Sequence, residues 1–427
     1  MATPLPSAAV RPVRFAALSI PTFRAYWIVS WISSTGDGME NVIRGLLIVR
    51  LVGIAEAPLW LGMAVFAHWV PFTLFSLYGG ALADRYDNRK VQIVAQLLLM
   101  TAAFGVAVAT LAGVVSVWWI LGLLLVHGFA GAIGNPAQQT LIHAIVGPDR
   151  LLSAISLNSG ARQISSVIGP AIAGLIYIAF GPGWGLLVNA LTFVPLLVFL
   201  SFVLRLAPKA KIAPQAVLES LREGIGFVRA RPRIGALIGV EMLPVIFLGH
   251  TFSSLLVVFA TVYLHTNELG YSFLLVASGI GAVGAAFYLA YARERVNTTP
   301  IIVGAAIVEM IAIFFFALST TYAISFVLML FVGAATVLTQ AFNNTTLQLS
   351  APDRIRGRVM GAYSFGTQGL RVINGPLLGF LATVFGAPLA VAGSAAVVIV
   401  GLGGIVAAVP QLRRGPDRPA GSGGPEA

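Results

Sequence analysis

The sequence predicts an all-α integral membrane protein with twelve transmembrane helices in two halves of six. Three observations lead to this prediction. The chain is 58% hydrophobic and only 10% charged, whereas soluble domains are about 25% charged. Apolar runs of about 20 residues, the length that crosses a bilayer, recur along most of the chain. Lys and Arg gather in alternate connections between these runs, which is typical of cytoplasmic loops.

The apolar runs are predicted to be helices because lipid cannot satisfy backbone hydrogen bonds and because the runs lack the apolar/polar alternation of a barrel strand. The runs end at short breaks made of Gly, Pro, charged or other polar residues. The predicted spans lie within residues 24–53, 53–85, 90–113, 113–150, 150–181, 181–205, 233–265, 265–293, 295–319, 319–354, 358–386 and 386–413.

The basic residues set the orientation of the chain. They precede the first span and follow every even-numbered span, and the other connections carry no Lys or Arg. We therefore expect a multi-pass membrane protein with both termini in the cytoplasm. Three Lys against 23 Arg, with abundant Ala and Gly, are typical of a GC-rich bacterial genome, so the bacterial inner membrane is the expected location. The formal charge of +11 is explained by these loops, so no nucleic-acid partner is expected. The sequence has no cysteine, which excludes disulfides and thiolate chemistry.

A polar interval near the midpoint divides the chain. Within it, Leu218, Leu221, Ile225 and Val228 recur at helical spacing. We expect an N-terminal half at residues 1–205, a cytoplasmic connector with an amphipathic helix at 206–233, a C-terminal half at 234–411 and a disordered tail at 412–427.

Two segments resemble each other, one in each half. GPDRLLSAISLNSGARQISSVIGPAIAGLIYIAFG ends at Gly181, and APDRIRGRVMGAYSFGTQGLRVINGPLLGFLATVFG ends at Gly386. Both contain Pro-Asp-Arg, then Gly-Pro, then Phe-Gly. Because the copies have the same sidedness in the membrane, the halves are expected to be parallel repeats around a central cavity.

A short motif joins the second and third predicted spans. The segment GGALADRYDNRKV, residues 79–91, resembles the loop signature GxxxDRxGRR of the major facilitator superfamily, although Asp87 stands where Gly is usual and Asn88 replaces a basic residue. The matching residues are Gly80, Asp84, Arg85, Arg89 and Lys90. The resemblance implies the major facilitator fold and a loop whose charge contacts change between two conformations.

A second motif lies in the fifth span. SSVIGPAIAG, residues 165–174, resembles the signature GxxxGPxxGG of drug–proton antiporters in that superfamily, with Gly169, Pro170 and Gly174 matching. Close packing of a proline-bent helix explains the same pattern. Together with TFRAYWIVSWISSTGDGM near the start, the chain up to about residue 410 resembles macrolide-efflux and enterobactin-exporter-like permeases. That branch implies alternating access, usually coupled to proton entry.

Charged residues interrupt the first span at SSTGDGMENVIRG, residues 33–45. Asp37, Glu40 and Arg44 are spaced three and four apart, so a helix places them on one face. Asp37 lies about 20 Å along the span, where a charge facing lipid would cost about 2.5 to 3.5 kcal/mol. This face is therefore expected to meet a cavity or partner groups, and Gly36 and Gly38 are expected to loosen the helix.

Two interpretations of these charges stay open. In the first, Asp37 or Glu40 takes up and releases a proton while the other, with Arg44, tunes its affinity. In the second, the three residues form a static ion-pair cluster that holds one conformation. Glu241 is a further candidate for proton coupling, because the repeat relates the seventh span to the first.

Other polar and aromatic residues within the spans are candidates for the substrate cavity. The two arginines among them precede the repeated Gly-Pro pairs, where they either bind anionic groups or neutralise carboxylates. The uncharged polar residues either line the cavity or bond neighbouring helices. His68 and His127 are expected to be packing residues. The candidates are Trp31, Asn135, Gln139, Arg162, His250, Gln340, Asn343 and Arg371.

The expected activity is secondary transport and not catalysis, because the sequence contains neither HExxH nor GxSxG, nor a phosphate loop of the form GxxxxGK[ST]. We expect proton-coupled export of amphipathic small molecules such as drugs, macrolides or siderophores. The alternative is a translocator of lysophospholipid or another lipid, which would need a lipid-facing opening lined by Arg. The expected partners are a small-molecule substrate, protons and the lipid bilayer. A monomer without cofactor or metal is expected.

Overall fold

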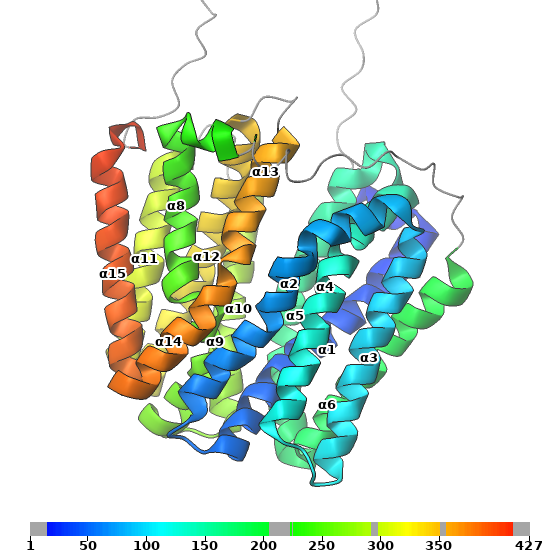
Figure 1. The fold of residues 1–427 in the computed structure, drawn as a ribbon, viewed down its shortest axis with the longest axis horizontal. Helices are drawn as coiled ribbons and strands as arrows, with labels where there is room; N and C mark the ends of the chain where they lie inside the picture. Colours follow the sequence, from blue (N-terminus) through cyan, green and yellow to red (C-terminus); the bar gives the residue numbers. More distant parts are fainter. Residues whose placement is uncertain (1–14, 205–222, 224, 292–297, 351–355, 413–427) are drawn as a thin grey trace, which may run out of the picture.

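The computed structural model describes residues 15–204, 223, 225–291, 298–350 and 356–412, which form helices and turns with no strand among them (Figure 1). The N-terminal half contains α1 (Pro21–Val52), α2 (Ala57–Arg85), α3 (Asn88–Leu111), α4 (Val117–Val146), α5 (Leu151–Phe180) and α6 (Pro182–Val198), which continues as the π-helical turn η3 (Phe199–Val203). Short 3-10 turns, η1 (Ala16–Ser19) and η2 (Pro148–Arg150), precede α1 and α5.

The C-terminal half begins with a broken helix. The elements are α8 (Pro232–Phe247), α9 (Gly249–Val258) with the π-helical turn η4 (Phe259–Tyr263), α10 (Glu268–Tyr291), α11 (Thr298–Leu318), α12 (Tyr322–Ser350), α13 (Arg356–Ser364), the π-helical turn η5 (Phe365–Gly369), α14 (Arg371–Phe385), α15 (Ala387–Ala408) and the 3-10 turn η6 (Pro410–Leu412).

Ten helical segments in the described part of the chain are long and apolar enough to cross a bilayer. Two more complete the predicted twelve. The helix α1 is long enough but carries several charges, and α13 joins α14 through a π-helical turn. The sequence prediction of an all-α membrane fold is therefore confirmed.

The repeated Phe-Gly pairs end one helix and start the next in each half. Gly181 and Gly386 have backbone φ angles of 84° and 82°, a region that favours glycine because it has no Cβ atom. Pro182 and Pro388 follow them at the first or second position of the next helix, where a missing backbone N–H has no consequence. The repeat thus specifies a tight turn between two spans.

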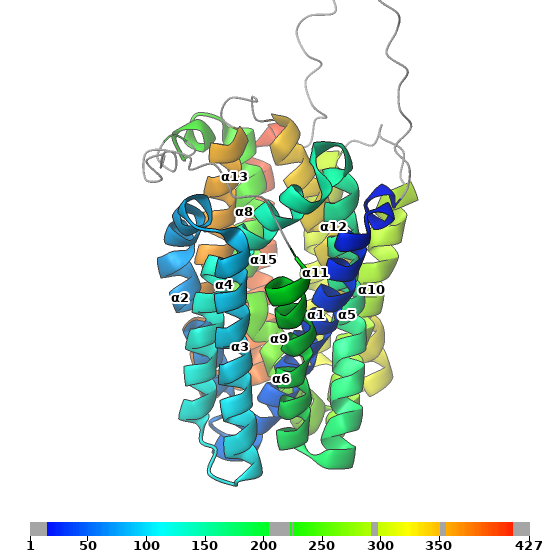
Figure 2. The same ribbon diagram turned by 90° about the vertical axis from the view of Figure 1, so that its right-hand side faces the viewer.

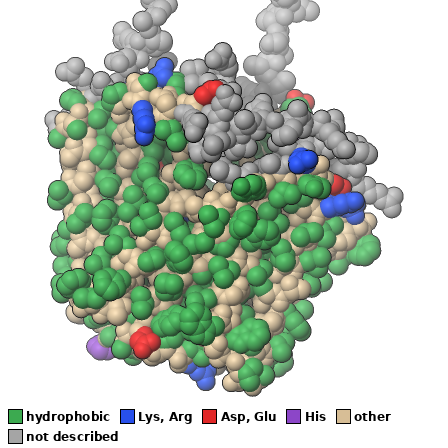
Figure 3. Space-filling view, viewed as in Figure 1, with side chains coloured by type: hydrophobic (Ala, Val, Ile, Leu, Met, Phe, Trp, Pro, Cys, Tyr) green, Lys and Arg blue, Asp and Glu red, His purple; other side chains and the backbone are tan. Residues whose placement is uncertain are grey.

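The two halves lie side by side, and the chain begins and ends at the same edge of the bundle (Figures 1 and 2). We call the edge where α1 begins and α15 ends the terminal end, and the opposite edge the far end. Hydrophobic side chains cover the middle of the visible face, whereas charged side chains lie near its two edges (Figure 3). This distribution suits a bilayer around the middle of the molecule.

The halves meet along α2 with α14 and along α5 with α10. A Cβ atom added to Gly62 would lie 2.2 Å from the carbonyl oxygen of Gly375, and one added to Gly379 would lie 2.8 Å from that of Pro58. Gly174 is similarly close to Ser272 Oγ, at 2.5 Å. Glycine therefore lets the backbones approach at these crossings.

These crossings lie toward the far end. Gly62 is near the start of α2, Gly375 is in the second half of the α13–α14 segment, and Gly174 is close to the end of α5. Closer to the terminal end, Thr73 Oγ1 donates a hydrogen bond to the carbonyl oxygen of Gly369 at 3.3 Å. Both helix pairs thus pack closely in the part of the bundle away from the termini.

Some predictions fall outside the described residues. The connector lies mostly within residues 205–222 and 224, so its amphipathic helix stays a prediction, as do the boundaries drawn from it. The tail at 413–427 and the second Pro-Asp-Arg at residues 352–354 also lie outside the described part.

Candidate functional site

A charged cluster lies in the N-terminal half, with Glu40 of α1 at its centre. Glu40 is 1% exposed. Arg44 Nη1 donates to Glu40 Oε1 at 3.1 Å, one helical turn away, and Asn189 Nδ2 of α6 donates to the other carboxylate oxygen at 2.9 Å. Buried ionised carboxylates require such partners. The cluster therefore holds a carboxylate within the membrane without exposing it to lipid.

Asp37 and two histidines extend this cluster. Asp37 interacts electrostatically with His127, Glu40 and Arg44, and its buried Oδ1 has no hydrogen-bond partner among the described residues. His127 Nδ1 of α4 lies 3.9 Å from Glu40 Oε1, and the His127 ring lies 5.0 Å from the His68 ring of α2. Asp37 is thus the less satisfied carboxylate of the pair.

A second carboxylate cluster lies in the C-terminal half around Glu241 of α8. Tyr363 Oη donates to Glu241 Oε2 at 2.6 Å, and Asn343 Nδ2 donates to the same oxygen at 2.8 Å. Arg371 is near enough to Glu241 to interact electrostatically, although the described residues show no salt bridge between them. Glu309 lies in α11, where its Oε1 accepts a hydrogen bond from Thr336 Oγ1 at 2.8 Å.

The two clusters approach each other at Trp69 of α2. The His250 ring stacks on the Trp69 ring at a centroid distance of 5.7 Å and an interplanar angle of 26°. Arg371 Cζ lies 4.7 Å from the Trp69 ring centroid. Within α2, the ring of His68 meets that of Trp69 edge-on at 5.1 Å. Ring and charge contacts therefore run from one half to the other.

Several polar side chains of this region are partly or fully exposed at the protein surface. The side chains of Arg44 and His127 are 18% and 20% exposed, and His250 is an exposed residue although its ring touches Trp69 of the other half. Asn41, which accepts a hydrogen bond from Arg44 Nη2, is also exposed. These polar surfaces are consistent with water reaching the region between the halves.

The remaining cavity candidates differ in their surroundings. Asn343 is fully buried and donates a hydrogen bond to Glu241, whereas four of the other candidates are exposed. Trp31 stacks on Trp27 at 6.1 Å, and its indole N–H has no hydrogen-bond partner among the described residues. A cavity role for all of them stays a prediction. The exposed candidates are Asn135, Gln139, Arg162 and Gln340.

The loop motif at the end of α2 anchors α3 and α6. Asp87 caps α3, because its Oδ1 accepts a hydrogen bond from the backbone N–H of Arg89 at 2.9 Å. The Arg89 guanidinium donates to the carbonyl oxygens of Leu200 and Ser201 where α6 ends. Capping explains why Asp can replace the usual Gly at residue 87. The side chain of Asp84 and the surroundings of Gly80 lie outside the described part, and Arg85 and Lys90 are exposed.

The antiporter-like motif packs α5 against both halves. A Cβ atom at Gly169 would lie 2.9 Å from Gly38 Cα of α1, and Gly174 faces Ser272 of α10. Gly36 similarly lies against Thr192 and Asn189 of α6. The expectation that Gly36 and Gly38 loosen the helix was wrong, because α1 is continuous and both glycines serve close helix packing. Pro170 lies within the continuous α5.

Sequence reasoning missed several residues of the site. The sequence predicted a packing role for His68 and His127. No pattern in it identified Asn189 or Trp69 as residues of the site. A lone Asn in the apolar stretch GLLVNALTF is a recognisable signal, since a buried amide needs a partner. Nothing in the sequence pairs it with Glu40 rather than another group. No group of three His, Cys, Asp or Glu side chains suited to a metal ion occurs among the described residues.

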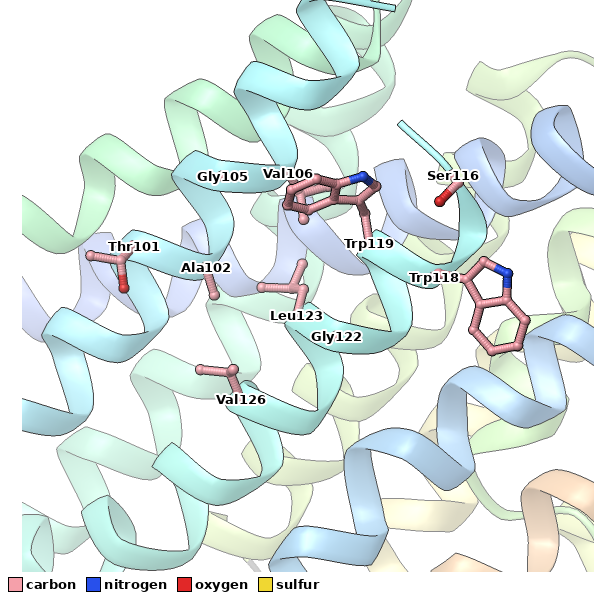
Figure 4. Close-up of a pocket in the computed structure, with 10 residues that line it drawn as sticks. All are labelled: Thr101, Ala102, Gly105, Val106, Ser116, Trp118, Trp119, Gly122, Leu123 and Val126. Atoms are coloured by element: carbon pink, nitrogen blue, oxygen red, sulfur yellow. The ribbon is translucent and has the colours of Figure 1, made fainter. Parts of the chain in front are cut away.

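Two surface grooves lie on the outside of the bundle. The larger, about 510 Å³, runs between α3 and α4 beside the indoles of Trp118 and Trp119 (Figure 4). The second, about 330 Å³, lies against α14 and α15. Neither is lined by Arg, so neither provides the basic opening expected of a lipid translocator.

Comparisons with known proteins agree with this architecture. A family model described as a transmembrane secretion effector matches residues 13–418. The enterobactin exporter EntS of Shigella flexneri is 25% identical over 369 residues, which cover 84% of this chain and 85% of the relative. The EntS protein of Shigella boydii serotype 18 is 26% identical over 372 residues, with the same coverage.

Solved transporter structures share the fold. A D-xylose–proton symporter superposes with a TM-score of 0.72 at 12% identity and covers 91% of this chain and 97% of its own. The nucleoside transporter NupG superposes with a TM-score of 0.69 at 14% identity, and the match covers 90% of this chain and 98% of NupG. At such low identity, the likeness concerns the fold alone.

Proposed function

Because the chain belongs to the transmembrane secretion effector family of the major facilitator superfamily, we propose that it exports amphipathic small molecules of the siderophore class in exchange for protons. The chain is a multi-pass membrane transporter and not an enzyme. The names of the relatives, enterobactin exporters, support export. The proposed location is the bacterial inner membrane, with both termini cytoplasmic and the chain acting as a monomer.

The observation that carries this proposal is the charged cluster of α1. Glu40 already has Arg44 and Asn189 as partners, whereas Asp37 Oδ1 is buried without one. An ionised carboxylate is costly in such a place, and a protonated one is less so. We therefore assign proton exchange to Asp37, and the stabilisation of the charged form of Glu40 to Arg44.

Transport then proceeds by alternate opening of the two edges of the bundle. The close crossings of α2 with α14 and of α5 with α10 support a form closed at the far end. With cytoplasmic termini, this form accepts substrate from the cytoplasm. Separation of the crossings would expose the same polar region to the outside, where substrate leaves and a proton reaches Asp37. Substrate and proton move in opposite directions across one cycle.

Replacing Asp37 with Asn is expected to abolish proton-driven accumulation, because the amide cannot exchange a proton. The measurement is uptake of enterobactin, used as a probe, into inside-out vesicles with an acidic interior. Wild-type vesicles should accumulate the probe, and D37N vesicles should match vesicles without the protein. Glu56→Gln is the control, since Glu56 is an exposed carboxylate in the connection between α1 and α2. Undiminished accumulation by D37N would exclude Asp37 from proton exchange, and accumulation by wild type without a gradient would contradict antiport.

A further inference from the structure

The helix that brings His250 to the interface is broken at a defined point. α8 ends at Phe247, and Gly249, with φ of 37°, begins α9. Asn374 of α14 bridges the break: its Oδ1 accepts from the Thr251 backbone N–H at 3.0 Å and from Thr251 Oγ1, and its Nδ2 donates to the Ile246 carbonyl at 3.3 Å. Asn374 and Thr251 are fully buried. The break is therefore a specified feature, with its freed backbone groups satisfied.

A second irregularity brings Arg371 to the same place. The π-helical turn Phe365–Gly369 precedes α14. Arg371 is the first residue of α14. Arg371 Nε donates to the Thr367 carbonyl within this turn at 3.2 Å. π-Helical turns are rare and occur frequently at functional sites. The helix break before His250 and the π-helical turn before Arg371 thus place these two side chains against Trp69.

Trp69 lies between these groups but belongs to the other half of the molecule. Its ring stacks on His250 and lies under the Arg371 guanidinium, and the residue is only 9% exposed. A guanidinium over an indole face is attracted by the negative face of the ring, most strongly where water is excluded. The contact of Trp69 with His250 and Arg371, which we call the Trp69 clasp, can exist only while α2 lies against α9 and α14.

The clasp also completes a row of contacts between the two carboxylate clusters. From Glu40 the row passes through His127 and His68 to Trp69. From Trp69 it continues to Arg371, which interacts electrostatically with Glu241 although the described residues show no ion pair between them. Every residue before Arg371 belongs to the N-terminal half, so the row crosses between the halves at the ring of Trp69.

From these contacts we infer that Trp69 is a positioning residue for transport: it holds the far end closed and couples the Glu40 cluster to the Glu241 cluster. This inference rests on the proposed alternation of the two halves. The new element is a specific residue: a change at the carboxylate cluster of one half is transmitted to the other half through the Trp69 side chain. Trp69 acts on transport through its neighbours, without any need to touch substrate.

The first test measures the separation of the halves. The native chain has no cysteine, so spin labels at Ile54→Cys and Leu389→Cys, both exposed positions at the far end, report one distance by pulsed electron resonance in purified protein. Trp69→Ala should raise the ratio of open to closed forms about tenfold, because it removes a ring contact and a cation–π contact. Trp69→Phe should restore part of the closed form.

Trp60→Ala is the matched control. Trp60 lies on the same helix, but its ring meets Trp118 of α4 in the same half, at 5.3 Å. W60A removes a ring of the same size as W69A does, but it should leave the ratio of open to closed forms unchanged. Equal effects of W60A and W69A, or no effect of W69A, would overturn the inference. If W69A does not fold, His250→Ala provides the same comparison, because it removes the stack and leaves the indole in place.

The second test measures coupling between the clusters. Glu40→Gln and Glu241→Gln are combined in one double-mutant cycle, with the ratio of open to closed forms as the readout. The two changes should be non-additive when Trp69 is present and additive in the W69A background. Non-additivity that survives W69A, or additivity in the presence of Trp69, would contradict the coupling role. These distances need neither substrate nor a proton gradient, so the outcome is independent of whether the chain proves to be a proton-driven exporter.

Discussion

Gly62→Ala is expected to eliminate the form closed at the far end. The added methyl would lie 2.2 Å from the Gly375 carbonyl oxygen, and side-chain Cβ atoms in proteins essentially never come within 3.0 Å of a neighbour. The opposing atom is backbone, so no side-chain rotation relieves the overlap. Since Gly62 and Gly375 belong to different halves, the relief available is separation of α2 from α14. Transport should fall to background, because a cycle needs both forms.

The measurement is the distance between spin labels at Ile54→Cys and Leu389→Cys, together with probe uptake in vesicles. Gly122→Ala is the control, because a Cβ atom at Gly122 meets nothing within 4 Å. That change should preserve both distance and uptake, and it should favour the helix by up to about 1 kcal/mol. A G62A protein that kept the closed distance would show that the crossing of α2 with α14 does not limit the approach of the halves.

Glu40→Ala is expected to have the largest effect on stability. It removes the ion-pair partner of Arg44 and leaves the fully buried Nδ2 of Asn189 without an acceptor. Breaking a buried ion pair costs about 3 to 5 kcal/mol. The partial exposure of Arg44 lowers the expected loss to about 2 to 4 kcal/mol, because water can screen the charge that remains.

Thermal unfolding in detergent checks this prediction. E40A should melt well below the wild-type protein, and Glu56→Ala should not, since Glu56 is exposed and contacts Trp60 of the next helical turn. Restoring neutrality with Glu40→Ala/Arg44→Leu should recover part of the stability, because the uncompensated cation is gone. If E40A melts with the wild-type protein, Glu40 is not the structural centre of the cluster.

The fold could be predicted because it follows from properties that act along the chain. Hydrophobic length, basic loops and the repeated Gly-Pro and Phe-Gly pairs specify the spans and their turns. The spacing of Asp37, Glu40 and Arg44 likewise predicted one charged helix face, and the Glu40–Arg44 bond lies within that helix. These are local relations that helix geometry determines.

The rest of the site depends on contacts between distant segments. Asn189 is 149 residues from Glu40, and Asn374 is 123 residues from Thr251, its partner just after the helix break. These residue pairs form because particular helices pack against each other, and the hydropathy of the sequence does not predict which helices do so. The glycines of α1 show the same limit: their sequence suggested a loose helix, whereas the helices packed around them make each a point of close contact.

The central claim is that the polar region beside Glu40 faces a passage that opens to each side of the membrane in turn. Asn41→Cys tests it most directly, because Asn41 is exposed beside Arg44 and would be the chain's first thiol. A membrane-impermeant thiol reagent is applied to inside-out and right-side-out vesicles. The claim predicts labelling from the cytoplasmic side in the otherwise unchanged protein, and from the opposite side when G62A holds the far end open. Labelling from neither side, or from the same side in both proteins, would contradict it.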